Sequence, residues 1–98
     1  MRKFNYQIKI ITQFLNYFGI IPKFQNGTFY GIRIVKVFGT PVIKSFYLSF
    51  HFHEIYALKK ADIRENKTEE FISDDIDEVI NFLFPDLTRQ LSVDYLLH

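Results

Sequence analysis

The apolar residues of 4–18 recur at alternating steps of four and three, and Gly19 follows them. This spacing places them on one stripe of a helix, which a glycine commonly ends. A strand through Ile10 is the alternative, because residues 4–10 also alternate between apolar and polar side chains. We favour the helix, since no turn signal separates Ile10 from Phe14. The stripe consists of Phe4, Ile8, Ile11, Leu15 and Phe18.

A hairpin is predicted at Asn26 and Gly27, which form the strongest local signal in the chain. Both residue types tolerate the positive φ that a type I′ turn requires. A short strand over 20–25 should therefore pair with a long strand over 28–38. Pro22 has no backbone N–H, so the short strand is expected at an edge of the sheet.

A third strand is predicted over 42–53, after a turn at 39–41, because its even positions from 46 to 52 are apolar. Burial of one face requires that partners share parity, and a three-residue loop would provide this. The expected pairs are Phe38–Val42, Ile34–Phe46, Ile32–Leu48 and Tyr30–Phe50, with Lys36 opposite Lys44 at the rim. Helices should cover this even-numbered face. The outer face would then carry Phe24, Phe29, Arg33, Val35, Val37, Tyr47 and His51.

The carboxyl half is predicted to be helical. Residues 54–61 can form a short helix, and 62–70 have the composition of an exposed connection. Ser73 is the expected N-cap of a helix whose first turn is rich in aspartate, which suits the positive end of the helix dipole. Pro85 either ends that helix or opens a final one over 86–97. The apolar stripe of the first helix is formed by Ile72, Ile76, Val79, Ile80 and Leu83.

These elements predict one α+β domain over residues 1–98. It has an N-terminal helix, a three-stranded antiparallel β-meander and two to three C-terminal helices packed on one sheet face. Apolar residues form 48% of the chain and aromatic residues 18%, which excludes general disorder. The absence of cysteine excludes disulfides, thiolate metal sites and thiol nucleophiles. No targeting segment or membrane span is visible, so a cytoplasmic location is expected.

Charge is divided unevenly between the two halves of the chain. Residues 1–53 hold seven Lys or Arg and no acid, whereas 54–98 hold eleven acids and five bases. Such a division predicts either a charged partner for one half or neutralisation of one half by the other. The acids are densest at Asp74, Asp75, Asp77 and Glu78, which could meet a partner with a basic surface or simply begin a helix. No glycine follows at the position that a calcium loop requires.

The basic half of the chain also contains residues that fit a nucleic-acid surface. Arg33, Lys36, Lys44 and Tyr47 combine positive charge with an aromatic ring, as a nucleic-acid surface requires, although Arg33 and Tyr47 could equally form a local cation–π pair.

A metal site is another hypothesis that the sequence raises. His51 and His53 share one face of the predicted strand, and Glu54 and His98 could complete it. Their placement as exposed positions of an alternating strand is favoured, and neither a metal nor a cofactor is expected.

The sequence therefore predicts a small intracellular protein-binding inhibitor that acts by occlusion and is not an enzyme, since no nucleophile elbow or phosphate loop is present. An immunity or antitoxin-type protein that neutralises a bacterial toxin, such as a nuclease, is the narrower hypothesis. A small nucleic-acid-binding module is the alternative, and a homodimer through the outer face is a third hypothesis. No membrane partner is expected. The predicted partner-binding residues are Asp74, Asp75, Asp77, Glu78, Phe29, Arg33 and Tyr47.

Overall fold

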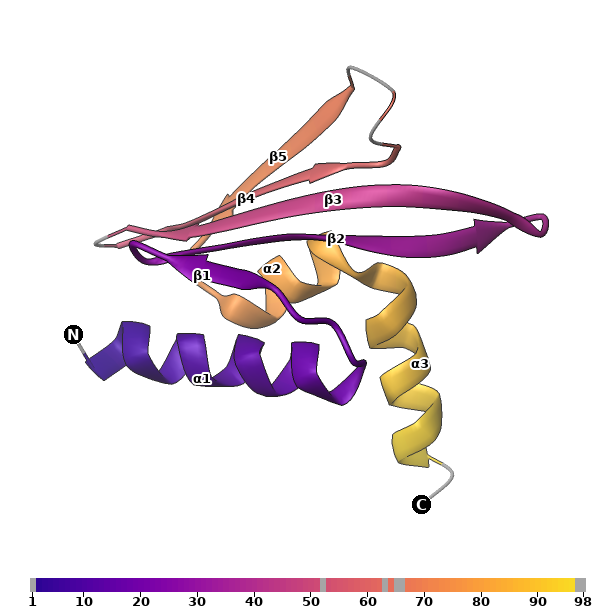
Figure 1. Ribbon diagram of the computed structural model, residues 1–98. Helices are drawn as coiled ribbons and strands as arrows, with labels where there is room; N and C mark the ends of the chain where they lie inside the picture. The colour runs from indigo at the N-terminus through magenta and orange to yellow at the C-terminus, as the bar shows by residue number, and fades with distance from the viewer. Residues whose placement is uncertain (1, 52, 63, 65–66, 97–98) are drawn as a thin grey trace.

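The computed structural model describes residues 2–51, 53–62, 64 and 67–96, and it shows one antiparallel sheet with all three described helices on one side (Figure 1). The α+β class, the N-terminal helix and the C-terminal helices are confirmed, but the described part of the sheet has five strands rather than three. The helices are α1 (Arg2–Tyr17), α2 (Ile76–Leu83) and α3 (Pro85–Leu96). The strands are β1 (Lys23–Gln25), β2 (Thr28–Val37), β3 (Thr40–Phe50), β4 (Ile55–Lys60) and β5 (Thr68–Ser73).

Helix α1 forms where the apolar stripe predicts it. Ile11 and Leu15 are fully buried, and the side chain of Phe4 lies outside the described ones. Gly19 ends the helix with φ +70°, while the N–H of Ile20 donates to the carbonyl of Leu15 at 2.9 Å. Only glycine adopts that φ without a steric cost, which explains why the helix stops here.

The sheet is a meander in which each strand pairs with the next, in the order β1-β2-β3-β4-β5. The predicted short helix over 54–61 is instead β4, and β5 begins within the predicted connection. Ile55 and Ala57 are both fully buried, two residues apart, as a strand with one packed face requires. Pairing with β3 and burial under α2 therefore outweigh the helical tendency of this segment.

The register of the β2–β3 hairpin also differs from the prediction. Its loop has two residues, Phe38 and Gly39, with φ of 51° and 81°, and Val37 pairs with Thr40. Because a two-residue loop joins odd positions of β2 to even positions of β3, the predicted equal parity is wrong. Ile34 pairs with Ile43 rather than with Phe46.

This register reverses the faces predicted for β2. Phe29, expected on the outer face, is 3% exposed in the core, whereas Ile32 and Ile34, expected inside, are 56% and 67% exposed. Phe24 stays beside Phe29 on the packed side, with ring centroids 4.4 Å apart. Val35 and Val37 share that side by the alternation of the strand.

The lysines expected to face each other are separated as well. Lys36 lies opposite Pro41, and Lys44 lies opposite Arg33. Since successive side chains of a strand point to opposite faces, Lys44 and Arg33 share the packed side and Lys36 lies on the other side.

The core lies between the sheet and helices α1 and α2. Phe84, at the junction of α2 and α3, is fully buried, and its ring centroid lies 5.1 Å from that of Phe46 and 5.7 Å from that of Phe14. One side chain thus connects the helix junction to α1 and to β3. The buried apolar residues are Ile11, Leu15, Phe29, Phe46, Leu48, Ile55, Ala57, Ile76, Val79, Ile80, Leu83 and Phe84.

Helix α2 begins two residues later than predicted. Asp75 is the N-cap and accepts a hydrogen bond from the N–H of Asp77 at 2.9 Å, in place of Ser73. Ser73 belongs to β5, as does Ile72, which is 56% exposed rather than part of the helical stripe. Pro85 opens α3.

Candidate functional site

One face of the sheet is apolar and is not covered by any described element. Figure 1 shows α1, α2 and α3 on the opposite side. Its side chains come from alternate positions of β2, β3, β4 and β5, as the register dictates. A solvated sheet face normally carries polar residues at these positions. We call this surface the open face, and it consists of Tyr30, Ile32, Ile34, Ile43, Tyr47, Tyr56, Leu58 and Ile72.

Tyrosines occupy the centre of the open face. Tyr30 lies directly opposite Tyr47, whose ring centroid is 6.3 Å from that of Tyr56 at an interplanar angle of 71°. A hydrogen bond to the Glu70 carboxylate, followed by partial burial and the charge of Glu70, raises the pKa of the Tyr56 hydroxyl.

The exposed area of the chain is large for its mass. A folded monomer of this mass is expected to expose about 5,900 Å², whereas this structure exposes 7160 Å². The excess, about 1,300 Å², is larger than the roughly 800 Å² that each partner buries in a standard protein interface.

Charged side chains on the same side of the sheet lie toward its rim. Lys23, Lys36 and Lys60 share the parity of the open face in their strands, as does one carboxylate, Glu70. The rim is therefore predominantly basic, and the centre is uncharged.

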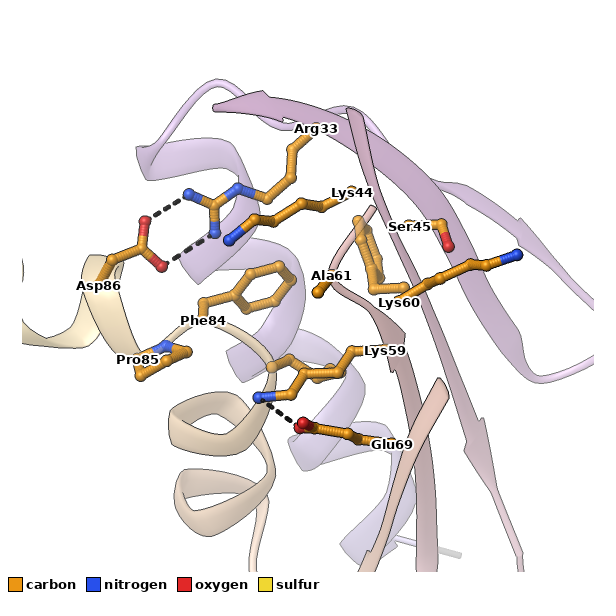
Figure 2. A pocket seen from close by; sticks show the side chains of 12 residues that line it. Arg33, Lys44, Ser45, Lys59, Lys60, Ala61, Glu69, Phe84, Pro85 and Asp86 are labelled. Carbon is orange, nitrogen blue, oxygen red and sulfur yellow. Dashed lines mark hydrogen bonds and ion pairs between the residues drawn. The ribbon is translucent and has the colours of Figure 1, made fainter. Parts of the chain in front are cut away.

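A small pocket lies on the other side of the sheet, where β2, β3 and β4 meet the α2–α3 junction (Figure 2). Its volume is about 140 Å³. Arg33 forms a two-pronged ion pair with Asp86, with 3.2 Å between Nη1 and Oδ1, and its guanidinium carbon lies 5.6 Å from the Phe84 ring centroid. Lys59 pairs with Glu69 at 3.3 Å. The two carboxylates neutralise Arg33 and Lys59, and because Lys44 and Lys60 also line the pocket, it keeps a net positive charge.

Asp86 lies in the first turn of α3. Burial would raise the pKa of its carboxyl group, but the hydrogen bonds and charge of Arg33, with the backbone N–H groups of Asp86 and Leu87, outweigh burial and lower that pKa. A carboxyl group with a lowered pKa in the folded state contributes stability above its ordinary pKa and loses it as the pH falls.

The substitution Asp86→Asn tests this contribution. Because the Asp86 side chain is 55% exposed, we expect a loss of at most about 1 kcal/mol in the free energy of unfolding at neutral pH. The difference from the wild type should begin to shrink as the pH falls below about 4 and should vanish only below the lowered pKa of folded Asp86. Urea denaturation across this pH range measures it. A difference that stays constant with pH would contradict the electrostatic origin.

The acid cluster predicted to bind a partner is exposed at the start of α2. Hydrogen bonds within the helix cap occupy two of its four carboxylates: Asp75 is the N-cap, and Glu78 accepts from the Ser73 hydroxyl at 2.7 Å. The backbone carbonyl of Asp74 accepts from Gln7 at 3.0 Å, which joins α1 to this cap. Capping thus accounts for much of the cluster, and its binding role stays a prediction.

The set predicted for nucleic acid is split between the two sides of the sheet. Lys36 and Tyr47 lie on the side of the open face, whereas Arg33 and Lys44 lie at the pocket. The expected cation–π partner of Arg33 is also different, since its guanidinium contacts Phe84 rather than Tyr47. The structure therefore does not assemble these four residues into one surface.

The two histidines lie beyond the end of β3, not within it. The His51 ring nitrogen Nε2 is 3.2 Å from the Ser49 hydroxyl, and His53 lies in the loop before β4. Within the described residues, no group of three His, Asp or Glu side chains could hold a metal ion. Phe52 and His98 lie outside the described residues.

The sequence did not identify most of the open face. It named Tyr47 but placed Ile32 and Ile34 in the core and Ile72 in a helix. The signal that could have found them is the alternation of β2, in which both faces are apolar. A strand of that kind requires cover on two sides, whereas helices cover one.

Comparison with known proteins gives no family for this chain. No family model matches it, and neither a curated protein nor a solved structure matches it. The described helices include none that is long and apolar enough to cross a membrane.

Proposed function

We propose that this chain is a protein-binding domain whose open face packs against a protein partner. The observation that supports this most directly is the uncovered apolar face itself. Contiguous exposed apolar patches are uncommon on monomeric proteins and mark interaction sites. An inhibitor that acts by occlusion would use such a face, and the immunity or antitoxin subclass stays a prediction.

The composition of the open face favours a protein over a nucleic acid. Its most exposed members are the aliphatic side chains of Ile32, Ile34 and Ile72, at 56%, 67% and 56%. Bases stack on exposed aromatic rings, but Tyr47 is only 39% exposed and meets Tyr56 edge to face. Aliphatic and aromatic side chains together are typical of the centre of a protein interface.

The rim specifies the chemistry of the partner. Because Lys23, Lys36 and Lys60 surround the apolar centre, the complementary surface has an apolar centre and an acidic edge. Such complementarity raises the rate of association and suppresses wrong partners, while the buried apolar centre supplies most of the affinity.

The proposal is tested with a substitution at the centre of the open face. Proteins captured from native cells by the immobilised chain are identified, and each candidate is purified and titrated by calorimetry. The substitution Tyr47→Ala should weaken binding of the true partner at least about 30-fold, as expected for a central tyrosine.

The matched control lies on the other side of the molecule. Asp77→Lys alters the exposed start of α2 and should leave the affinity unchanged. If Asp77→Lys abolishes binding and Tyr47→Ala does not, the acid cluster is the binding surface and the proposal is wrong. Capture of RNA in place of protein, with affinity that falls steeply as salt rises, would also contradict it.

A further inference from the structure

Strand β2 has an unpaired edge along most of its length. Strand β1 pairs with it only over Thr28–Tyr30, so residues 31–37 have no partner on that side among the described strands. Pro22 precedes β1 and cannot donate a backbone hydrogen bond, which limits the extension of that ladder. Alternate residues of 31–37 therefore direct their N–H and C=O groups away from β3, toward the side that β1 leaves unpaired.

The surroundings of this edge leave room for another strand. A groove of about 620 Å³ runs beside it, between β2 on one side and α3 and the segment before β1 on the other. Its walls include Ile32, Ile34 and Leu87. A long, exposed, apolar edge is a template for strand addition unless something blocks it.

The opposite edge of the same sheet is β5, and its charge is opposite. Strand β5 (Thr68–Ser73) carries Glu69 and Glu70 and no cation. Residues 31–37 carry Arg33 and Lys36 and no carboxylate. Among the described ion pairs, Arg33 meets Asp86 and Glu69 meets Lys59 within one copy. Lys36 on the β2 edge and Glu70 on the β5 edge are therefore the opposite charges that two copies can bring together.

The two edges also match in direction and in face. Neighbouring strands of the meander alternate in direction, so β5 of a second copy displaced along the sheet runs antiparallel to β2 of the first. Odd positions of both strands face the packed side, and even positions face the open side. Pairing of even with even positions therefore keeps the helices of both copies on one side.

One register of β2 with β5 pairs opposite charges with each other and apolar side chains with each other. It places Ile34 opposite Ile72 and Lys36 opposite Glu70 on the open side, and Val35 opposite Phe71 on the packed side. Opposite charges and apolar pairs directly across a ladder are each favourable. Pairing of two β2 edges would instead bring Lys36 of each copy to the interface with no carboxylate from either edge.

We infer that this chain associates head to tail with copies of itself, by antiparallel pairing of residues 31–37 of β2 with β5 of the next copy. Such a contact is heterologous, so a pair of copies keeps one free β2 edge and one free β5 edge and can add further copies, in an open chain or in a ring. Each added copy prolongs the open face by another sheet. The inference does not rest on the proposed function, because it uses the edges and not the binding of another protein.

A charge exchange tests the register. Sedimentation velocity at low ionic strength should show that the mass of the wild type rises with concentration. Lys36→Glu alone and Glu70→Lys alone should each weaken association by about tenfold, because each places like charges opposite one another. An equimolar mixture of the two variants should associate as the wild type does, and so should the double variant.

Two controls separate this contact from other causes. Tyr56→Phe removes the hydroxyl group whose pKa Glu70 raises while keeping both charges, and it should associate normally. Tyr47→Ala should also associate normally, since it alters only the centre of the open face. Thermal unfolding shows whether each variant folds.

The result that overturns the inference is a wild type that remains monomeric at every concentration. In that case the edge charges only keep the sheet from pairing. Association that the two single variants leave unchanged, or that mixing them does not restore, would overturn it as well. Both results leave the test of the open face unaffected.

Discussion

Replacing Phe84 by alanine should lower the free energy of unfolding by about 3–5 kcal/mol, the usual cost of truncating a fully buried phenylalanine. Phe84 has no exposed surface, and its ring contacts Phe14 of α1 and Phe46 of β3. It also lies under the guanidinium of Arg33. Its removal would leave a cavity at the point where the helix junction meets the sheet.

Urea denaturation, followed by circular dichroism, measures this loss. The total stability of a domain of this size is about 5–15 kcal/mol, so the variant should unfold at a much lower urea concentration. Phe24→Ala is the matched control, because Phe24 is the same residue type but 50% exposed. Equal losses in the two variants would show that Phe84 does not hold the centre of the core.

Local signals predicted the elements that local physics determines. The apolar stripe and Gly19 identified α1, and Asn26 and Gly27 identified the first hairpin, with φ of 54° and 74°. In each case the sequence contains both the element and its end. The first residue of α2 was predicted less accurately. Ser73 and Asp75 are both favourable N-cap residue types, and their spacing to the apolar stripe does not decide between them.

Strand β4 could not be found in this way. The segment Ile55–Lys60 is short, and its apolar residues fit a strand or one turn and a half of helix equally well. Its partners, β3 and β5, decide the outcome. Strand β5 pairs only with β4 among the described strands. Because the sequence prediction lacked β4, it lacked β5 as well.

The register of the β2–β3 hairpin depended on a conformation that the sequence disfavours. Phe38 takes a positive φ of 51° in the two-residue loop, which is uncommon for a bulky side chain. Turn chemistry therefore favoured a loop over 39–41 instead. Because β2 is apolar on both faces, its alternation could not correct the error, and a slip of odd length exchanged the two faces.

Which β2 side chains belong to the open face also depends on the length of the β2–β3 loop. Tyr47 was placed correctly because β3 alternates clearly, whereas the contribution of β2 to the open face appears only once the loop length is known. The division of charge between the basic first half and the acidic second half of the chain can also be assigned to particular elements. Its basic part includes the free edge of β2, and its acidic part includes β5 and the helix cap.

A pair of alanine substitutions in β2 distinguishes the two registers directly. With the observed register, Phe29→Ala should cost about 3–4 kcal/mol, because Phe29 is 3% exposed and packs against Phe24 and Phe50. Ile34→Ala should change the free energy of unfolding by no more than about 0.5 kcal/mol, since Ile34 is 67% exposed.

An equal-parity register would reverse the order of these two losses, because it buries Ile34 against Phe46 and exposes Phe29. Urea denaturation of both variants and the wild type decides between them. The denaturation should be measured at low protein concentration. Association through the β2 edge then does not add to the apparent stability of the wild type. A larger loss for Ile34→Ala than for Phe29→Ala would show that the hairpin has a three-residue loop. The open face would then consist of the opposite set of β2 side chains.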